Sequence, residues 1–171
     1  MPEALSGDPS ERVAGRRGTL RHLMAWGALA LSVRPGRAAP TLTLPKTASL
    51  PESLAQALRA REPLVVMVSL PGCPFCTTVR EHHLVHSRSQ GGHVVQVDMR
   101  DRTPIVDFDG QSLTQDAWIR QRHIKLAPTV LFFGSGGQEV AKRLDGAYLP
   151  DFYAAYFDEQ YRIARQAVSA K

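Results

Sequence analysis

The chain has 171 residues, a formal net charge of +5 and only two cysteines. Most of the positive charge lies in the segment 1–38, which holds six arginines against Glu3, Asp8 and Glu11; the segment 39–171 therefore carries 15 basic and 13 acidic side chains. A segment of that size can bury the core of one domain, and its nearly balanced charge, without a basic helix or basic–aromatic alternation, excludes an obvious nucleic-acid-binding surface.

The segment 1–38 is typical of an export signal. An apolar run over 23–33 follows several arginines, and it is too short to span a bilayer as a free helix. Small residues at Gly36 and Ala38 would stand at the −3 and −1 positions if cleavage follows Ala38. We therefore expect 1–38 to be a signal peptide, with an uncleaved membrane anchor or a basic tail as the alternatives.

The arginine pair in this segment indicates an export route. Arg16 and Arg17 are followed after two residues by Leu20 and a basic residue, which resembles a twin-arginine signal, although Thr19 replaces the usual aromatic residue. The expected location of the processed protein is the periplasm, and contact with the membrane is expected only during export or if the signal is not cleaved.

After the signal, we expect an extended linker over 39–48 and one folded domain over 49–171. Ser49 and Glu52 have the spacing of a capping box, so a helix should begin there. The continuous apolar run over 64–70 predicts a strand buried on both faces.

The middle of the chain predicts a crossover. A helix should run from about 73 to 89 and lead to a second strand over 94–99, parallel to the first through a right-handed connection. Residues 100–113 are polar and rich in turn formers, so no regular element is expected there. A short helix, capped by Thr114, should then extend to about residue 122.

The remaining residues predict a hairpin and a final helix. A strand over 126–133, with a proline at its entrance, is followed by Gly134-Ser135-Gly136-Gly137 and a second strand over 138–144, which should pair antiparallel. The last helix should run from about 150 to 168. This order of helices and strands predicts a mixed α/β sandwich.

The two cysteines carry the functional prediction. Cys73 and Cys76 follow a predicted strand and open a predicted helix. A helix N-terminus presents unpaired N–H groups and a partial positive charge, which favour a thiolate and lower the pKa of a cysteine placed there. Cys73 is therefore the expected nucleophile, and Cys76, one helical turn later, the expected resolving thiol.

Other uses of the pair fit less well. Haem attachment needs a histidine directly after the second cysteine, where Thr77 stands. A purely structural disulfide usually closes a longer loop. A zinc site needs four ligands, and without a second cysteine pair it would need histidines, of which the candidates are His82, His83, His86 and His93. Redox chemistry is the favoured interpretation, and no metal site is predicted.

Three features indicate a family. The CxxC pair at a strand-to-helix junction, Ala127-Pro128-Thr129 at the entrance of a strand hairpin and the terminal helix together resemble the thioredoxin superfamily over about residues 49–168. Within it, the chain looks most like the periplasmic thioredoxins of the SoxW type, on the motifs Pro71-Gly72-Cys73-Pro74-Phe75-Cys76, Asp107-Phe108-Asp109-Gly110, Leu113-Thr114, and Ala127-Pro128-Thr129 with Phe132-Phe133. The resemblance implies a thioredoxin fold: a central mixed β-sheet flanked by helices, with the CxxC at the N-terminus of the first long active-site helix.

The resemblance also implies a substrate-binding loop. The bond before Pro128 is expected to be cis, which leaves the backbone of Ala127 free to pair with an extended substrate strand. Pro74 and Phe75, between the two cysteines, complete the expected substrate-contacting set. This dipeptide is closer to the Pro-Tyr of glutaredoxins than to the Gly-Pro of cytosolic thioredoxins, so we expect a reduction potential between roughly −270 and −180 mV.

The chain departs from thioredoxins at the proton acceptor. Met67 stands where they place a buried aspartate, and Gly72 where they have tryptophan. Ser69 is nearer to the cysteines but is a poor base. Glu81 and Asp98 are the candidate acceptors.

The expected function is that of an exported protein-disulfide reductase acting on disulfide-bearing client proteins. It needs no cofactor, and a membrane thiol-electron donor of the DsbD type is the partner that the resemblance implies. Two alternatives stay open: a disulfide oxidase or isomerase, and a non-catalytic thioredoxin scaffold that binds a metal or partner through His82, His83 and His86. Trp118, Phe108 and the aromatic residues of the last helix are expected in the core.

Overall fold

The computed structural model describes residues 42–147 and 150–170. The predicted signal peptide therefore lies outside the described residues. None of the helices in these ranges combines the length and the hydrophobicity that a membrane span requires.

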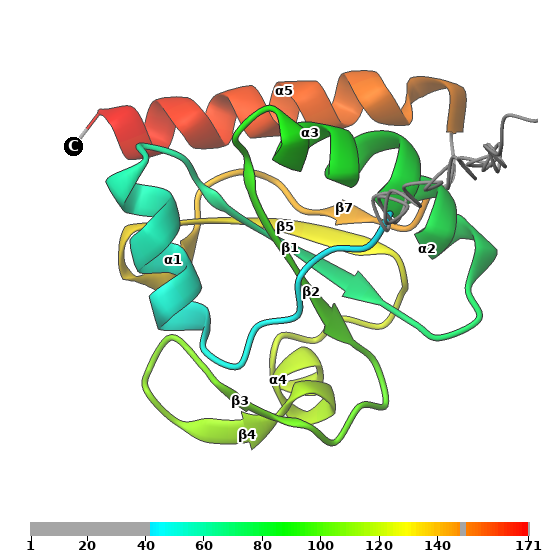
Figure 1. Cartoon of the computed structure of the whole chain (residues 1–171), viewed down its shortest axis with the longest axis vertical. Helices are drawn as coiled ribbons and strands as arrows, with labels where there is room; N and C mark the ends of the chain where they lie inside the picture. The colour runs from blue at the N-terminus through cyan, green and yellow to red at the C-terminus, as the bar shows by residue number, and fades with distance from the viewer. Residues whose placement is uncertain (1–41, 148–149, 171) are drawn as a thin grey trace, which may run out of the picture. The chain divides into compact units, whose positions relative to one another are not determined.

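The described residues alternate helices and strands in nearly the predicted order (Figure 1). In chain order they form α1 (Leu50–Arg59), β1 (Leu64–Ser69), α2 (Pro74–Val79), the π-helical turn η1 (Arg80–Leu84), α3 (Val85–Ser89), β2 (His93–Asp98), β3 (Pro104–Val106), β4 (Ser112–Thr114), α4 (Gln115–Gln121), β5 (Thr129–Gly134), the 3₁₀ turn η2 (Ser135–Gly137), β6 (Gln138–Glu139), β7 (Leu144–Asp145) and α5 (Pro150–Ser169). The predicted helix over 73–89 is present as α2, η1 and α3 in succession.

The main sheet is mixed, as predicted. Strand β1 runs parallel to β2 on one side and antiparallel to β5 on the other, so that Val66 lies between Val95 and Leu131. Strands β6 and β7 both pair antiparallel with β5. Every residue of β1 and of β5 is buried, which explains why these two strands are continuous apolar runs in the sequence.

Helices cover both faces of this sheet. Helices α1 and α4 pack on one face, where Leu54 and Trp118 join Val66 in one apolar cluster. Helices α2 and α5 and the turn η1 pack on the other face, where Cys76 and Phe157 belong to a second cluster. Figure 1 shows α2, α3 and α5 on the opposite side of the sheet from α1.

The predicted helix starts are present. The Ser49 side chain accepts a hydrogen bond from the Glu52 N–H at 3.3 Å, and Thr114 accepts one from the Ala117 N–H at 3.1 Å. Each bond satisfies a backbone donor that has no partner within the helix.

Two regions differ from the sequence prediction. Residues 100–113 were expected to be irregular but contain the β3–β4 hairpin, whose turn is held by the Asp107 carboxylate accepting from the N–H groups of Asp109 and Gln111. The predicted strand over 138–144 is interrupted between β6 and β7: the Val140 N–H still donates to the Phe132 carbonyl of β5 at 2.9 Å, but Ala141 to Arg143 leave the sheet.

The aromatic residues of α5 divide between core and surface. Tyr153 and Phe157 are buried, whereas Phe152 and Tyr156 are exposed. The prediction that all of them are core residues is therefore wrong for these two, which lie on the outer side of the helix.

The segment before α1 is extended, and it also belongs to the sheet. Lys46 forms a parallel bridge with Gln96, the Gln96 N–H donates to the carbonyl of Pro45 at 2.9 Å, and Leu44 is buried. Residues 44–46 therefore cover the outer edge of β2.

Two neighbouring glycines provide a matched test of packing. Gly136 and Gly137 both have a left-handed backbone (φ +70° and +67°), but a Cβ on Gly136 would meet open space, whereas one on Gly137 would overlap the Phe108 side chain. We expect Gly136→Ala to cost about 1 kcal/mol of unfolding free energy from backbone strain, and Gly137→Ala about 1–3 kcal/mol more from the overlap. Urea denaturation measures both, and equal midpoints would contradict this packing.

Candidate active site

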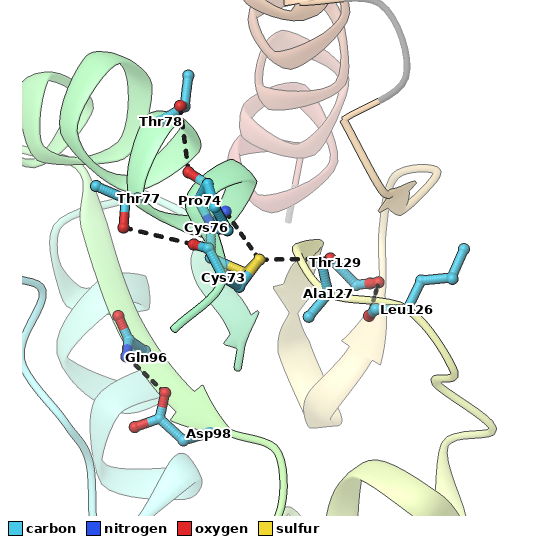
Figure 2. The surroundings of a disulfide bond; sticks show 10 residues. All are labelled: Cys73, Pro74, Cys76, Thr77, Thr78, Gln96, Asp98, Leu126, Ala127 and Thr129. Atoms are coloured by element: carbon cyan, nitrogen blue, oxygen red, sulfur yellow. Dashed lines mark hydrogen bonds between the residues drawn. A yellow bond between two sulfur atoms is a disulfide. The ribbon is translucent and has the colours of Figure 1, made fainter. Parts of the chain in front are cut away.

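The two cysteines form a disulfide at the junction between β1 and α2 (Figure 2). Their Cα atoms are 5.2 Å apart. Cys73 is the N-cap of α2 in an extended conformation, and Pro74 follows as the first helical residue. The Cys73 N–H donates to the Leu70 carbonyl at 3.2 Å, which ties the loop after β1 to the start of the helix.

The helix N-terminus acts directly on the Cys73 sulfur. The backbone N–H of Cys76 donates to Cys73 Sγ at 3.1 Å. A donor aimed at this atom stabilises negative charge on it, and the helix dipole adds to the effect. The arrangement favours Cys73 as the sulfur that becomes a thiolate on reduction.

The two sulfurs differ in access. Cys76 has 0% exposure and packs in the apolar cluster that includes Met67 and Val79. Cys73 is only partly buried. An external disulfide can therefore approach Cys73, while Cys76 is confined to reaction with its neighbour.

A second loop lies beside the Cys73 sulfur. The carbonyl oxygen of Ala127 is 3.8 Å from Cys73 Sγ, and the Ala127–Pro128 bond is cis. A disulfide sulfur has no proton to donate, so this is a contact that becomes a hydrogen bond only in the reduced thiol. Thr129, which donates to the Leu126 carbonyl at 2.9 Å, closes the loop.

The other predicted substrate-contacting residues present apolar surface near the disulfide. Phe75 is 62% exposed, and Pro74 is also exposed. Leu126, which sequence reasoning did not single out, is 43% exposed and precedes Ala127. Phe75 and Leu126 are thus two of the five large apolar side chains that are exposed among the described residues.

The candidate proton acceptors have different surroundings. Glu81 is partly exposed in the η1 turn. Asp98 ends β2 with 6% exposure, and its carboxylate accepts from Gln96 Nε2 at 2.6 Å and pairs with Lys46 Nζ at 2.8 Å. The hydrogen bond to Asp98 raises the pKa of Lys46, against the opposing effect of burial. No sequence pattern marks Lys46, because it lies in the predicted linker.

The histidines that follow the CxxC, in η1 and α3, do not point toward a common site. His83 lies against Tyr153, with ring centroids 5.0 Å apart, while His86 Nε2 is 2.9 Å from the side-chain nitrogen of Gln90. Within residues 42–147 and 150–170, no group of three metal-ligating side chains is present.

The contact between His83 and Tyr153 predicts a pH dependence of stability. Burial lowers the pKa of His83 from its ordinary value of 6.5, and the charge of His82 lowers it further, while Asp158 opposes the shift. The unfolded chain therefore takes up this proton at a higher pH than the folded chain, so stability falls as the pH drops below about 6.5. His83→Phe keeps an aromatic ring there and should lose less stability between pH 7 and 5 in urea titrations; an unchanged slope would contradict the assignment.

The unequal access of the two sulfurs predicts unequal alkylation. In the reduced protein at neutral pH, iodoacetamide should modify Cys76→Ser, which retains Cys73, at least about tenfold faster than Cys73→Ser, because the thiolate is the reacting form and Cys76 is buried. Mass spectrometry of timed samples measures both rates. Equal rates would remove the basis for assigning Cys73 as the nucleophile.

Known proteins were compared with this chain by sequence and by structure. A search of curated proteins found no match. Among solved structures, similar chains include thioredoxin h from poplar (19% identical over 63% of this chain and 85% of that one, TM-score 0.44). Others are the reduced form of the periplasmic thioredoxin SoxS from Paracoccus pantotrophus (19% identical, 60% and 99% covered, TM-score 0.39) and the DsbH oxidoreductase (16% identical, 74% and 90% covered, TM-score 0.48).

The family assignment rests on the sequence profile of the thioredoxin-like domain. That profile matches residues 50–161, which include both cysteines and the loop at Ala127. The match spans more than half of the chain, and the chain belongs to the thioredoxin-like domain family.

Proposed function

We propose that this protein is an exported thiol–disulfide oxidoreductase that reduces disulfides of client proteins in the periplasm. The observation that carries the proposal is the unequal pair of sulfurs. Cys73 is partly exposed and receives a backbone N–H at 3.1 Å, whereas Cys76 is buried and bonded to it. The fold and CxxC pair of the family support thiol–disulfide exchange in general.

The reaction has two exchange steps. The Cys73 thiolate attacks one sulfur of the client disulfide, and the other client sulfur leaves as a thiolate. Cys76 then attacks Cys73 Sγ, which releases the second client sulfur and forms the Cys73–Cys76 disulfide. Two electrons pass to the client, and the protein ends in its oxidised state.

Client binding should combine backbone pairing with apolar contact. An extended client segment placed beside Cys73 can pair with the backbone of Ala127. The exposed side chains of Phe75 and Leu126 offer apolar surface to the residues that flank the client cysteine. Pro128 follows this pairing position and has no N–H of its own to offer.

The proposed direction of electron flow and the proposed periplasmic location are supported by the sequence. The predicted signal over 1–38 supports export to the periplasm, and the resemblance to SoxW-type thioredoxins supports a reducing role there. A reductase must be recharged, and we propose a membrane thiol-electron donor of the DsbD type for this step. Thiol–disulfide exchange needs no haem, flavin, nucleotide or metal.

The proposal predicts the behaviour of two single substitutions. Residues 39–171 should catalyse insulin reduction by dithiothreitol, and Cys73→Ser should lower that activity at least about 100-fold, because the attacking thiolate is lost. Cys76→Ser should instead accumulate mixed disulfides with exported proteins, which mass spectrometry can identify. If Cys73→Ser retains activity, the proposed function is wrong.

The reduction potential tests the direction of electron flow. Equilibration with glutathione buffers should give a value between roughly −270 and −180 mV. A value near about −120 mV would indicate a protein that donates disulfides rather than one that reduces them.

A further inference from the structure

The loop that carries Ala127 is bonded to β7, on the side of β5 that faces away from β1. The Gly146 N–H, directly after β7, donates to the Pro128 carbonyl at 2.7 Å, and Asp145 lies opposite Thr129. Ala127 itself lies beside the disulfide, with its carbonyl oxygen 3.8 Å from Cys73 Sγ (Figure 2). Gly146 is therefore one strand position beyond the segment that contacts Cys73.

A hollow lies at Gly146, between β7 and the first turns of α5. Leu144, Gly146, Tyr153 and Tyr156 line it, together with three charged residues, and its volume is about 370 Å³. A cavity of roughly 150 Å³ is enough to hold a benzene ring. The hollow therefore has room for one large side chain of a bound protein segment.

Two tyrosines form the wall that α5 contributes. Tyr153 is 5% exposed, and its ring packs against His83, with ring centroids 5.0 Å apart, so this part of the wall is held in place. Tyr156, one turn later, is 51% exposed, so the hollow opens to solvent beside this ring. Leu144 of β7 adds aliphatic surface and packs against the same apolar cluster as Cys73 and Ala127. Such a wall favours an apolar ring, which gains edge or offset contacts with the two tyrosines.

The three charged residues of the lining are Lys142, Arg143 and Asp145. The Arg143 guanidinium is paired with Glu139, and the Asp145 carboxylate accepts a hydrogen bond from the Thr129 hydroxyl at 3.2 Å. Lys142 is exposed, and an ammonium group is attracted to the face of an aromatic ring. An aromatic side chain therefore fits this lining better than a saturated group of the same size.

We propose that this hollow binds an aromatic side chain of the client, two residues away from the client cysteine. The proposal rests on the proposed function and names the class of client that the site prefers. In an extended segment, side chains two positions apart lie about 6–7 Å apart on the same side, so this side chain faces the protein when the client cysteine faces Cys73. Neighbouring strands are about 4.8 Å apart, so that step is long enough to pass Pro128 and reach the hollow at Gly146.

Matched peptide disulfides test this subsite. Each peptide has one cysteine bonded to thionitrobenzoate, and phenylalanine, cyclohexylalanine or alanine stands two positions before the cysteine in one set and two positions after it in the other. The Cys73 thiolate of the reduced protein attacks the peptide sulfur, the bond from that sulfur to thionitrobenzoate breaks, and coloured thionitrobenzoate leaves with the electron pair. Stopped-flow absorbance gives the second-order rate constant for each peptide.

In one of the two sets, the phenylalanine peptide should react about tenfold faster than the alanine peptide, and about threefold faster than the cyclohexylalanine peptide, which has a similar size but no π face. Tyr156→Ala should bring the phenylalanine-to-alanine ratio close to one, and Lys142→Gln should remove the difference between phenylalanine and cyclohexylalanine. Phe152→Ala is the matched control: it removes an exposed ring one turn earlier on α5, outside the hollow, so both ratios should stay as in the wild type. Because each ratio is taken within one protein, a loss of folded protein in a variant cancels.

Equal rates for the phenylalanine and alanine peptides in both sets would overturn the subsite. A phenylalanine preference that survives Tyr156→Ala, or that disappears in Phe152→Ala, would overturn it as well. A cyclohexylalanine peptide as fast as the phenylalanine peptide would overturn the assignment to aromatic side chains. All of these outcomes leave thiol–disulfide exchange intact. If instead the wild type reacts with none of the peptides, or Cys73→Ser still releases thionitrobenzoate from them, the proposed function itself has failed.

Discussion

The path of β1 through the middle of the sheet determines where the groups of the site lie. Because β1 is parallel to β2 and antiparallel to β5, the last residues of β1 and β2 and the first residues of β5 lie side by side at the same end of the sheet. Cys73 follows β1, Asp98 ends β2, and Pro128 precedes β5. Three segments that are far apart in the sequence are brought together by strand pairing alone.

The helices make the two cysteine sulfurs differ in charge stabilisation and in exposure. The α2 helix directs a backbone N–H at Cys73 and carries Cys76 into the apolar cluster beneath α5. The Cys73 sulfur is therefore favoured as a thiolate near the surface, while the buried Cys76 sulfur is shielded from solvent and from external disulfides. The π-helical turn η1 inserts one wider turn into the same helical run, which places Leu84 in the core and His83 against Tyr153.

Local sequence patterns were sufficient for much of the fold. Buried runs predicted β1 and β5, the spacing of Ser49 and Glu52 predicted the start of α1, and the CxxC after a strand predicted the disulfide site. The β3–β4 hairpin was missed because it depends on one carboxylate, Asp107, binding two backbone N–H groups, which composition does not reveal. The break between β6 and β7 and the exposure of Phe152 likewise follow from how the chain packs rather than from local apolarity. Lys46 could not be assigned to the site, because its partner Asp98 lies far along the chain, at the end of β2.

The extended segment before α1 has a consequence for how the molecule behaves in a crowded compartment. Unpaired strand edges invite association with other chains through their free N–H and C=O groups. Residues 44–46 occupy that position along β2, and the opposite edge is broken between β6 and β7. One edge of the sheet is thus partly covered, and the other is interrupted. A truncation that begins at α1 would uncover one of them and favour self-association.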